Sequence, residues 1–240
     1  MISVCLATYN GSAYIEAQLR SVLEQLSHED EVVVADDGSS DETISIVNAV
    51  GDPRIKVVAT GGKLGVIKNF ERALLASRGE FIFLCDQDDV WLSGKVEQCV
   101  AELRSHLLVV TDCKVVDSQL NEIAPSFFRL RNSGSGLLHN LWKNSYLGCC
   151  MAFRRELLEY ALPFPLGIPM HDMWLGMIAE TKGKVSFLAS PLLLYRRHTL
   201  NASETAGKSS ASIGKMLTDR IVLGALVAGR VITNMSVKVS

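Results

Sequence analysis

Three aspartates directly after an apolar pentapeptide are the residues of this chain whose types and spacing point most clearly to chemistry. Phe81 to Cys85 is a run of five apolar residues, and Asp86, Asp88 and Asp89 follow it. So short an apolar run indicates a strand buried on both faces. Carboxylates held this close repel one another unless a cation neutralises them, and magnesium-type sites combine one or two carboxylates with phosphate oxygens. The stretch is therefore either a divalent-metal site at a strand end or an ordinary acidic loop.

The elements that must position these aspartates alternate between strand and helix patterns. Short apolar runs predict strands, and between them the spacing of apolar residues predicts helices. The strands are expected at 2–8, 31–35, 55–59 and 81–85, and the helices at 13–26, 39–50 and 66–76. This alternation is typical of an α/β fold with a mostly parallel central sheet flanked by helices. Ser39 and Glu42 fit a capping box that starts the second helix.

Polar residues follow each of these strands, and the carboxyl ends of parallel strands meet at one edge of the sheet, where such folds bind ligands. Residues 8–10, 36–37 and 86–89 are therefore expected to gather on one rim. Asp36 and Asp37 have a simpler interpretation as turn and capping residues, and the two readings stay open.

The remaining chain continues the pattern with a helix at 95–105, a strand at 107–112 and a buried segment at 147–153. Residues 125–136 form a loop that either faces an acceptor or lies on the surface. His171 and Asp172 begin an apolar helix ending near 182–183, and two short strands, 185–188 and 192–195, lead to Arg196, Arg197 and His198. Residues 200–212 read as a mobile segment. The stretch 213–235 predicts an amphipathic helix that packs on the core or lies on a membrane surface.

Composition limits the class of protein. The chain has 240 residues, 48% of them hydrophobic and 21% charged, with a net charge of −2. This charge argues against a nucleic-acid partner, because nucleic-acid-binding proteins carry a basic excess. No leader peptide is expected before the first strand, and no apolar run is long enough to span a bilayer. The six cysteines lack C-x-x-C spacing, which is typical of reduced core residues in a cytoplasmic protein.

Several common enzyme motifs are missing from the sequence. The turn after the first strand reads TYNGS and lacks the G-x-G-x-x-G pattern of dinucleotide-binding proteins. The chain has neither a Walker A motif nor H-E-x-x-H. A dinucleotide-dependent oxidoreductase and a P-loop enzyme are therefore not expected.

Five motifs in order resemble one known family. They are ISVCLATYNG, VVVADDGSSDET, GVIKNFERALLASRGEFIFLCDQDDVW, HDMW and YRRH. Together they resemble the inverting family-2 glycosyltransferases of the GT-A fold, and DQDDVW and HDMW are most similar to bacterial rhamnosyltransferase-like members that build surface polysaccharides. The resemblance covers residues 1–200 and implies a nucleotide-sugar-binding half at 1–105 and an acceptor-binding half at 106–200. Residues 201–240 would then form a flexible segment and a C-terminal helix.

The resemblance also implies roles for individual residues on the donor side. Thr8, Tyr9 and Asn10 would line the nucleoside pocket, and Asp36 or Asp37 would accept hydrogen bonds from the base or ribose. A second set would lie near the ribose and phosphates, with Lys68 standing where many members carry arginine. This set consists of Lys68, Asp86, Arg196 and Arg197.

For the chemistry, the resemblance implies that Asp88 holds Mn²⁺ or Mg²⁺, with Asp86 nearby and His198 as a further metal ligand. Asp172 would be the catalytic base. A carboxylate opposite the metal can take the acceptor hydroxyl proton while that oxygen attacks the anomeric carbon, and a single displacement inverts this centre. The family's synthase branch has a Q-x-x-R-W signature, which this chain lacks, so processive polymerisation is not expected.

The expected reaction moves a sugar, rhamnose being one candidate, from a nucleotide-diphosphate donor to a glycan or lipid-linked acceptor. Such an acceptor would bring the enzyme to the inner face of the cytoplasmic membrane. Two alternatives share the sheet and the carboxylates: a nucleotidyltransferase that makes a nucleotide sugar, and a non-catalytic sugar-nucleotide-binding protein. A lysine-rich and glycine-rich triphosphate loop would favour the first, whereas only an enzyme needs Asp172 as a base. The sequence leaves the donor, the acceptor and the oligomeric state open.

Overall fold

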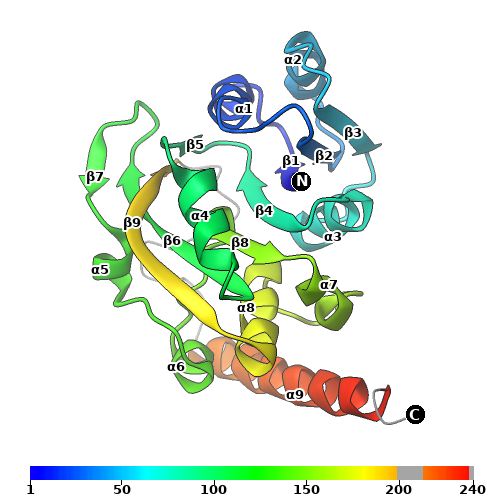
Figure 1. Ribbon diagram of the computed structural model, residues 1–240, viewed down its shortest axis with the longest axis vertical. Coiled ribbons are helices and arrows are strands. Elements are labelled where there is room, and N and C mark those ends of the chain that lie inside the picture. The colour runs from blue at the N-terminus through cyan, green and yellow to red at the C-terminus, as the bar shows by residue number, and fades with distance from the viewer. Residues whose placement is uncertain (199–212, 238–240) are drawn as a thin grey trace.

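The structure, a computed structural model, describes residues 1–198 and 213–237 (Figure 1). Within these ranges all strands belong to one nine-stranded mixed sheet with helices packed around it. The strands are β1 (Ile2–Thr8), β2 (Glu31–Asp36), β3 (Ile55–Thr60), β4 (Phe81–Asp86), β5 (Val90–Trp91), β6 (Leu108–Val116), β7 (Glu122–Ala124), β8 (Met151–Arg154) and β9 (Val185–Arg196).

Six of the nine described helices were predicted, although the first two are shorter than expected, and the three between residues 127 and 161 were not predicted. The helices are α1 (Ile15–Leu23), α2 (Thr43–Ala49), α3 (Val66–Ala76), α4 (Lys95–Leu103), α5 (Phe127–Arg131), α6 (Leu137–Trp142), α7 (Glu156–Ala161), α8 (His171–Lys182) and α9 (Ile213–Val237), with a short 3-10 turn η1 (Gly148–Cys150). The predicted mobile segment at 200–212 lies outside the described residues.

The first half of the sheet is parallel, in the order β3-β2-β1-β4. In the middle of β1, Cys5 pairs with Val33 of β2 on one side and with Leu84 of β4 on the other. All three side chains are fully buried, which accounts for the continuous apolar runs in the sequence. Because β1, β2 and β4 run in the same direction, the polar residues after them meet at one edge.

The second half of the sheet is mixed. β8 lies antiparallel between β4 and β6, β9 runs parallel to β6, and β5 and β7 pair antiparallel at the margins. The expected α/β architecture with a central sheet flanked by helices is observed, while the parallel arrangement is restricted to the first four strands and the β6–β9 pair. The long strand β9 curves across this half (Figure 1).

Three local predictions were wrong. The two short strands predicted at 185–188 and 192–195 are one strand, β9, because a register shift opposite Thr111 and Asp112 admits two extra residues before Pro191. The predicted loop at 125–136 contains the short helix α5, whose first turn is held by the Asp112 carboxylate through a hydrogen bond from the Phe128 amide at 3.0 Å. Ser39 does not form a capping box, since α2 starts at Thr43 with no side-chain cap.

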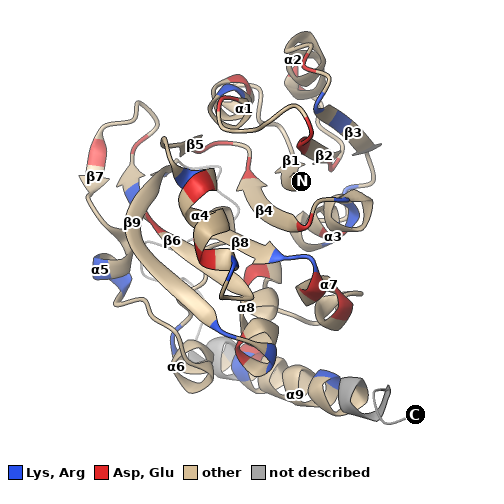
Figure 2. Cartoon of the chain, in the orientation of Figure 1, with Lys and Arg blue, Asp and Glu red and all other residues tan. Residues whose placement is uncertain are grey.

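The C-terminal helix α9 packs against α6 and α8. It buries Leu223 and Val227, and the Arg230 guanidinium donates hydrogen bonds to the carbonyls of Tyr160, Leu162 and Pro163. Figure 2 shows few charged positions along this helix. Of the two interpretations of the stretch 213–235, the core-packing helix is therefore observed. None of the helices in the described ranges has an apolar stretch long enough to cross a bilayer.

Candidate active site

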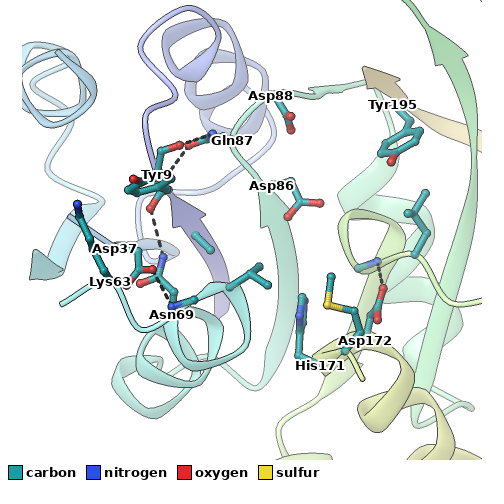
Figure 3. Close-up of a pocket in the computed structure, with 17 residues that line it drawn as sticks. Tyr9, Asp37, Lys63, Asn69, Asp86, Gln87, Asp88, His171, Asp172 and Tyr195 are labelled. Carbon is teal, nitrogen blue, oxygen red and sulfur yellow. Dashed lines mark hydrogen bonds between the residues drawn. The ribbon is translucent and has the colours of Figure 1, made fainter. Parts of the chain in front are cut away.

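A cavity of about 420 Å³ lies at the carboxyl ends of β1 and β4, with the start of α8 forming its opposite wall (Figure 3). Both halves of the chain contribute to its lining. Six of the predicted site residues line the cavity: Thr8, Tyr9, Asp37, Asp86, Asp88 and Asp172. The structure thus brings together side chains that are up to 164 positions apart in the sequence.

Tyr9 forms one wall of the cavity and is held by Gln87. The Gln87 side-chain amide accepts a hydrogen bond from the Tyr9 amide at 2.8 Å and donates one to the Tyr9 carbonyl at 2.9 Å. Tyr9 is 47% exposed, so its ring remains available to a planar ligand such as a nucleobase. These two hydrogen bonds hold the segment after β1 against the acidic turn after β4. The sequence did not predict this role for Gln87.

Asp37 and Asp36 have different surroundings, which separates the two candidates for the base or ribose contact. Asp37 lines the cavity and accepts hydrogen bonds from the Leu64 and Gly65 amides at 2.7 and 2.8 Å. Asp36 is 1% exposed, and its carboxylate accepts hydrogen bonds from the Thr8 hydroxyl and the Gly38 amide. Asp37 therefore faces the ligand side, and Asp36 holds the turn beneath it.

Asn10 and Lys68 lie outside the cavity lining. The Asn10 side-chain oxygen accepts a hydrogen bond from the Ser40 amide at 2.8 Å, which connects the turn after β1 to the turn after β2. Lys68 pairs with Glu71 on α3. The neighbouring Asn69 lines the cavity instead, and a buried asparagine within a helical apolar stripe is the sequence signal that could have indicated it.

The acidic turn after β4 holds three carboxyl groups with raised pKa values. Burial, together with the nearby Asp88 and Asp172, raises the pKa of Asp86 to about 8. Burial also raises the pKa of Asp88, although a hydrogen bond with His198 opposes it, and raises the pKa of Asp89 well above its ordinary value. These carboxylates are therefore poorly neutralised by the protein itself.

The donor set of this turn fits a hard divalent cation. Asp86 and Asp88 present carboxylate oxygens to the cavity, and Asp89 Oδ2 is buried without a partner among the described residues. His198 Nε2 lies 2.8 Å from Asp88 Oδ2, so the two lie close enough to share an ion. Oxygen atoms of Asp86 and Asp89 and the sulfur atom of Cys149 also lie within 4.8 Å of one another. Carboxylate oxygens suit Mg²⁺ and Mn²⁺ better than a thiol does.

Arg196 is 5% exposed and contacts the acidic turn after β4. Its backbone amide donates to Asp89 Oδ1 at 2.9 Å, and its Nε donates to the Asp88 carbonyl at 2.6 Å. Arg197 donates its amide to the Val116 carbonyl. Both arginines are absent from the described cavity lining. Arg196 therefore orients the acidic turn, and neither guanidinium contacts the cavity in this conformation.

Asp172 lies at the start of α8, on the wall opposite the acidic turn. Its carboxylate accepts hydrogen bonds from the Gly148 amide at 3.1 Å and the Met173 amide at 2.6 Å. Burial raises its pKa to about 6. A carboxyl group whose pKa lies just below neutrality is mostly ionised at pH 7 and accepts a proton more readily than an ordinary aspartate, as a general base should.

The model of Glycosyl transferase family 2 matches residues 3–161, about two-thirds of the chain. The chain belongs to glycosyl transferase family 2. Two similar curated proteins are named for their activities. The dTDP-rhamnosyl transferase RfbG of Shigella flexneri is 26% identical over 82% of this chain and 72% of its own length. The UDP-Glc:alpha-D-GlcNAc-diphosphoundecaprenol beta-1,3-glucosyltransferase WfgD of Escherichia coli is 26% identical over 75% of this chain and 70% of its own length.

Solved structures agree with this family-2 glycosyltransferase in fold. TarS of S. aureus in complex with UDP-GlcNAc superposes with a TM-score of 0.69 at 24% identity, covering 96% of this chain and 66% of the TarS chain. The mannosyltransferase PcManGT of Pyrobaculum calidifontis in complex with GDP-Man and Mn²⁺ gives a TM-score of 0.63 at 19% identity, over 100% of this chain and 80% of its own. The expected family and the GT-A fold are confirmed, and family membership favours sugar transfer over the nucleotidyltransferase alternative.

Proposed function

We propose that this family-2 glycosyltransferase transfers a sugar from a nucleotide-diphosphate donor to a hydroxyl group, with inversion at the anomeric carbon and Asp172 as the base. The observation that supports this most directly is the placement of Asp86 and Asp88 on one wall of a single cavity and Asp172 on the other. One displacement needs a donor held between a charge-stabilising site and a base. The positions of these three carboxylates in the cavity support such an arrangement.

The nucleoside end of the donor would lie against Tyr9, Thr8 and Asp37. The exposed ring of Tyr9 offers a stacking surface, and Asp37 offers carboxylate oxygens to ribose hydroxyls or a base N–H. Lys63, from the segment between β3 and α3, lines the same part of the cavity. Because a lysine ammonium acts as a point charge, it suits a phosphate oxygen.

Asp86 and Asp88 would hold the divalent cation, with His198 as a further candidate ligand through its contact with Asp88. When bound, Mn²⁺ or Mg²⁺ supplies positive charge to the departing diphosphate as a Lewis acid. Arg196 keeps the acidic turn in place through its bonds to Asp88 and Asp89. Asp172, held by the amides of Gly148 and Met173, accepts the proton of the attacking hydroxyl group.

We further propose a glycan or lipid-linked acceptor and contact with the inner face of the cytoplasmic membrane. The similarity to WfgD, a glucosyltransferase named for a diphosphoundecaprenol-linked sugar, supports this acceptor class. Leu138, Trp142 and Leu166 are 80%, 72% and 87% exposed, and apolar side chains presented to solvent suit an interfacial contact. Flotation of the protein with anionic vesicles tests the contact, and protein that stays at the bottom of the gradient argues against it.

Calorimetry tests the donor and metal assignment. The panel contains UDP-glucose, UDP-N-acetylglucosamine and dTDP-rhamnose, each with and without MnCl₂. We expect one donor to bind only with Mn²⁺, and Asp88→Asn to abolish this metal-dependent binding. Glu97→Gln changes an exposed carboxylate on α4 and is the matched control. Unchanged donor affinity in Asp88→Asn would remove Asp88 from the metal site, and no binding to any donor would sink the proposed function.

A further inference from the structure

His171 is a cavity residue to which the proposed function assigns no task. Its ring is 4% exposed, and neither Nδ1 nor Nε2 has a hydrogen-bond partner among the described residues. An unsatisfied buried polar atom usually costs about 1–3 kcal/mol, and native proteins contain few of them. Two such atoms on one ring in the wall of a cavity call for a ligand that supplies the missing partners.

The ring is held in one orientation by its neighbours. It stacks on Phe70 of α3, with ring centroids 4.0 Å apart and planes 23° apart. On another side lies Gly148, where a Cβ atom would stand 3.2 Å from His171 Nε2, closer than side chains normally pack. An aromatic stack and a glycine therefore hold this unpaired polar ring in one orientation, as the positioning of a binding group requires.

The location of His171 indicates which part of a donor it meets. Phe70 follows Asn69, which faces the nucleotide side of the cavity, and Asp172 follows His171 on the opposite wall. Figure 3 shows His171 between Asn69 and Asp172, on the side of the cavity across from Asp88. In a donor that spans the cavity from Tyr9 to Asp172, the group at this place is the transferred sugar.

The charge state of His171 suits a hydroxyl group. Burial lowers its pKa to about 3, so at neutral pH one ring nitrogen donates a hydrogen bond and the other accepts one. A sugar hydroxyl both donates and accepts, whereas a diphosphate needs cations. Among the described residues that line the cavity, Lys63 is the only lysine or arginine, and it belongs to the nucleotide side.

We propose that His171 hydrogen-bonds a hydroxyl group of the transferred sugar and so positions the anomeric carbon beside Asp172. The inference rests on the proposed function, because it requires a nucleotide-sugar donor in this cavity. It adds a sugar-recognition residue to the nucleotide and metal contacts already assigned.

The test separates sugar binding from nucleotide binding. For the donor that the wild-type protein binds from the panel, affinities are measured for that donor and for the matching UDP or dTDP, all with MnCl₂. His171→Phe keeps an aromatic ring on Phe70 and removes both nitrogens. We expect its affinity for the nucleoside diphosphate to stay within about twofold and its affinity for the nucleotide sugar to fall about tenfold, the loss typical of one or two hydrogen bonds.

Two further variants keep the test decisive. His171→Gln retains a donor and an acceptor and should recover part of the sugar-dependent affinity, whereas a merely structural role predicts no recovery. His139→Phe changes a histidine on α6 outside the cavity lining and should leave both affinities unchanged. Deoxy forms of the donor then identify the contacted hydroxyl, since removing it should weaken binding to the wild-type protein but not to His171→Phe.

The outcomes distinguish the two proposals. If His171→Phe binds the nucleotide sugar as tightly as the wild-type protein does, the role of His171 is wrong and the proposed function stands. If nucleoside diphosphate and nucleotide sugar weaken equally, His171 contributes no sugar contact and the inference also fails. If the wild-type protein binds no nucleotide sugar, the proposed function fails and this inference with it.

Discussion

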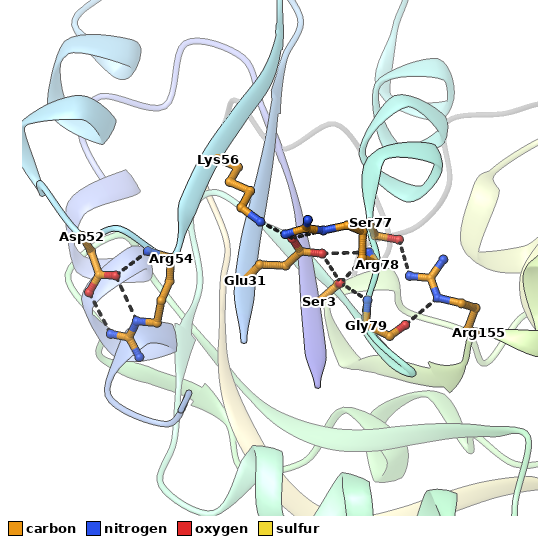
Figure 4. Close-up of polar contacts among 9 residues, drawn as sticks. All are labelled: Ser3, Glu31, Asp52, Arg54, Lys56, Ser77, Arg78, Gly79 and Arg155. Atoms are coloured by element: carbon orange, nitrogen blue, oxygen red, sulfur yellow. Dashed lines mark hydrogen bonds and ion pairs between the residues drawn. The ribbon is translucent and has the colours of Figure 1, made fainter. Parts of the chain in front are cut away.

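Carboxyl groups occur at both ends of the parallel strands, and their surroundings differ. At the amino end of β2, Glu31 accepts hydrogen bonds from the Ser3 hydroxyl and the Arg78 amide, both at 2.7 Å, and pairs with Lys56 at 2.8 Å (Figure 4). These bonds outweigh burial and lower the pKa of Glu31 to about 2. At the carboxyl end of β4, burial raises the pKa values of Asp86 and Asp88, and for Asp86 the nearby Asp88 and Asp172 add to the effect; burial also raises the pKa of Asp172 at the start of α8.

The difference in surroundings distinguishes a carboxylate that stabilises the fold from the carboxylates that line the candidate active site. Glu31 has a full set of partners and joins β1, β2, β3 and the turn before β4, so its negative charge stabilises the fold. Burial of the cavity carboxylates Asp86, Asp88 and Asp172 outweighs the bonds that they accept, so their ionised forms cost stability in the free protein and favour binding of a cation or a proton. A site that binds ligands commonly reduces stability in this way.

The largest expected effect comes from Asp172→Asn. The amide side chain keeps the shape of the carboxylate but cannot take a proton at physiological pH, so we expect sugar transfer to fall by about 10²–10⁴-fold with donor binding retained. Turnover with the donor identified by calorimetry measures this. Near-normal turnover would show that another group removes the acceptor proton. Asp172 would then have no catalytic role to distinguish it from Glu31.

Glu31→Gln should give the next largest effect, this time on stability. Removing the charge leaves Ser3, Lys56 and Arg78 with a weaker acceptor, and we expect a loss of about 2–3 kcal/mol in the free energy of unfolding at pH 7. Urea denaturation monitored by circular dichroism measures it. Nucleotide binding to the folded protein should not change. A variant as stable as the wild-type protein would mean that the Glu31 network contributes nothing net.

Asp172→Asn should have the opposite effect on stability. The folded-state pKa of about 6 exceeds the ordinary value of 3.8, so ionisation of Asp172 costs stability as the pH rises through this range. We expect the variant to gain about 1–3 kcal/mol at pH 7 and almost nothing at pH 4. Thermal unfolding of the metal-free protein at both pH values measures the gain. A variant less stable than the wild-type protein at pH 7 would contradict the cost assigned to this charge.

The smallest effect is expected for Glu16→Gln on the surface of α1. Glu16 pairs with Arg20 at 2.7 Å, but the two side chains are 55% and 64% exposed. Water screens such pairs, so the free energy of unfolding should change by less than about 0.5 kcal/mol. The same urea experiment measures it. A larger change would show that burial is not what distinguishes Glu31 from other paired carboxylates.

Much of the fold could be predicted because local signals were strong. The apolar runs of β1, β2 and β4 and the spacing in α3 predicted these elements within one residue at each end. The prediction divided β9 into two strands because Pro191 suggests a break. The register shift that accommodates Pro191 depends on the partner strand β6 and cannot be seen in the local sequence. Helix α5 was missed although Ser126 caps it locally, because the helix has only five residues and its first turn also depends on a hydrogen bond to Asp112, 16 residues before Phe128.

Of the residues predicted for the candidate site, some line the cavity and others are absent from its described lining. Thr8, Asp37, Asp86 and Asp88 were predicted from their places after strands and Asp172 from the resemblance of HDMW to a family motif, and all five line the cavity. Asn10, Asp36, Lys68, Arg196 and Arg197 share those neighbourhoods, yet they are absent from the described cavity lining. The spacing of apolar residues and the position of polar residues after strands predict which segment approaches the edge of the sheet. The direction of each side chain depends on packing against other segments.

The sequence by itself determined the family, the alternation of strands and helices over the first 105 residues and the acidic turn after β4, because these follow from local composition and from motifs in a fixed order. The tertiary structure alone decided that Asp172 faces Asp86 across a cavity, that Asp37 and not Asp36 lines it, and that the ring nitrogens of His171 have no hydrogen-bond partner among the described residues. These are relations between segments distant in the chain. Such relations depend on which surfaces pack together and on how much water they exclude.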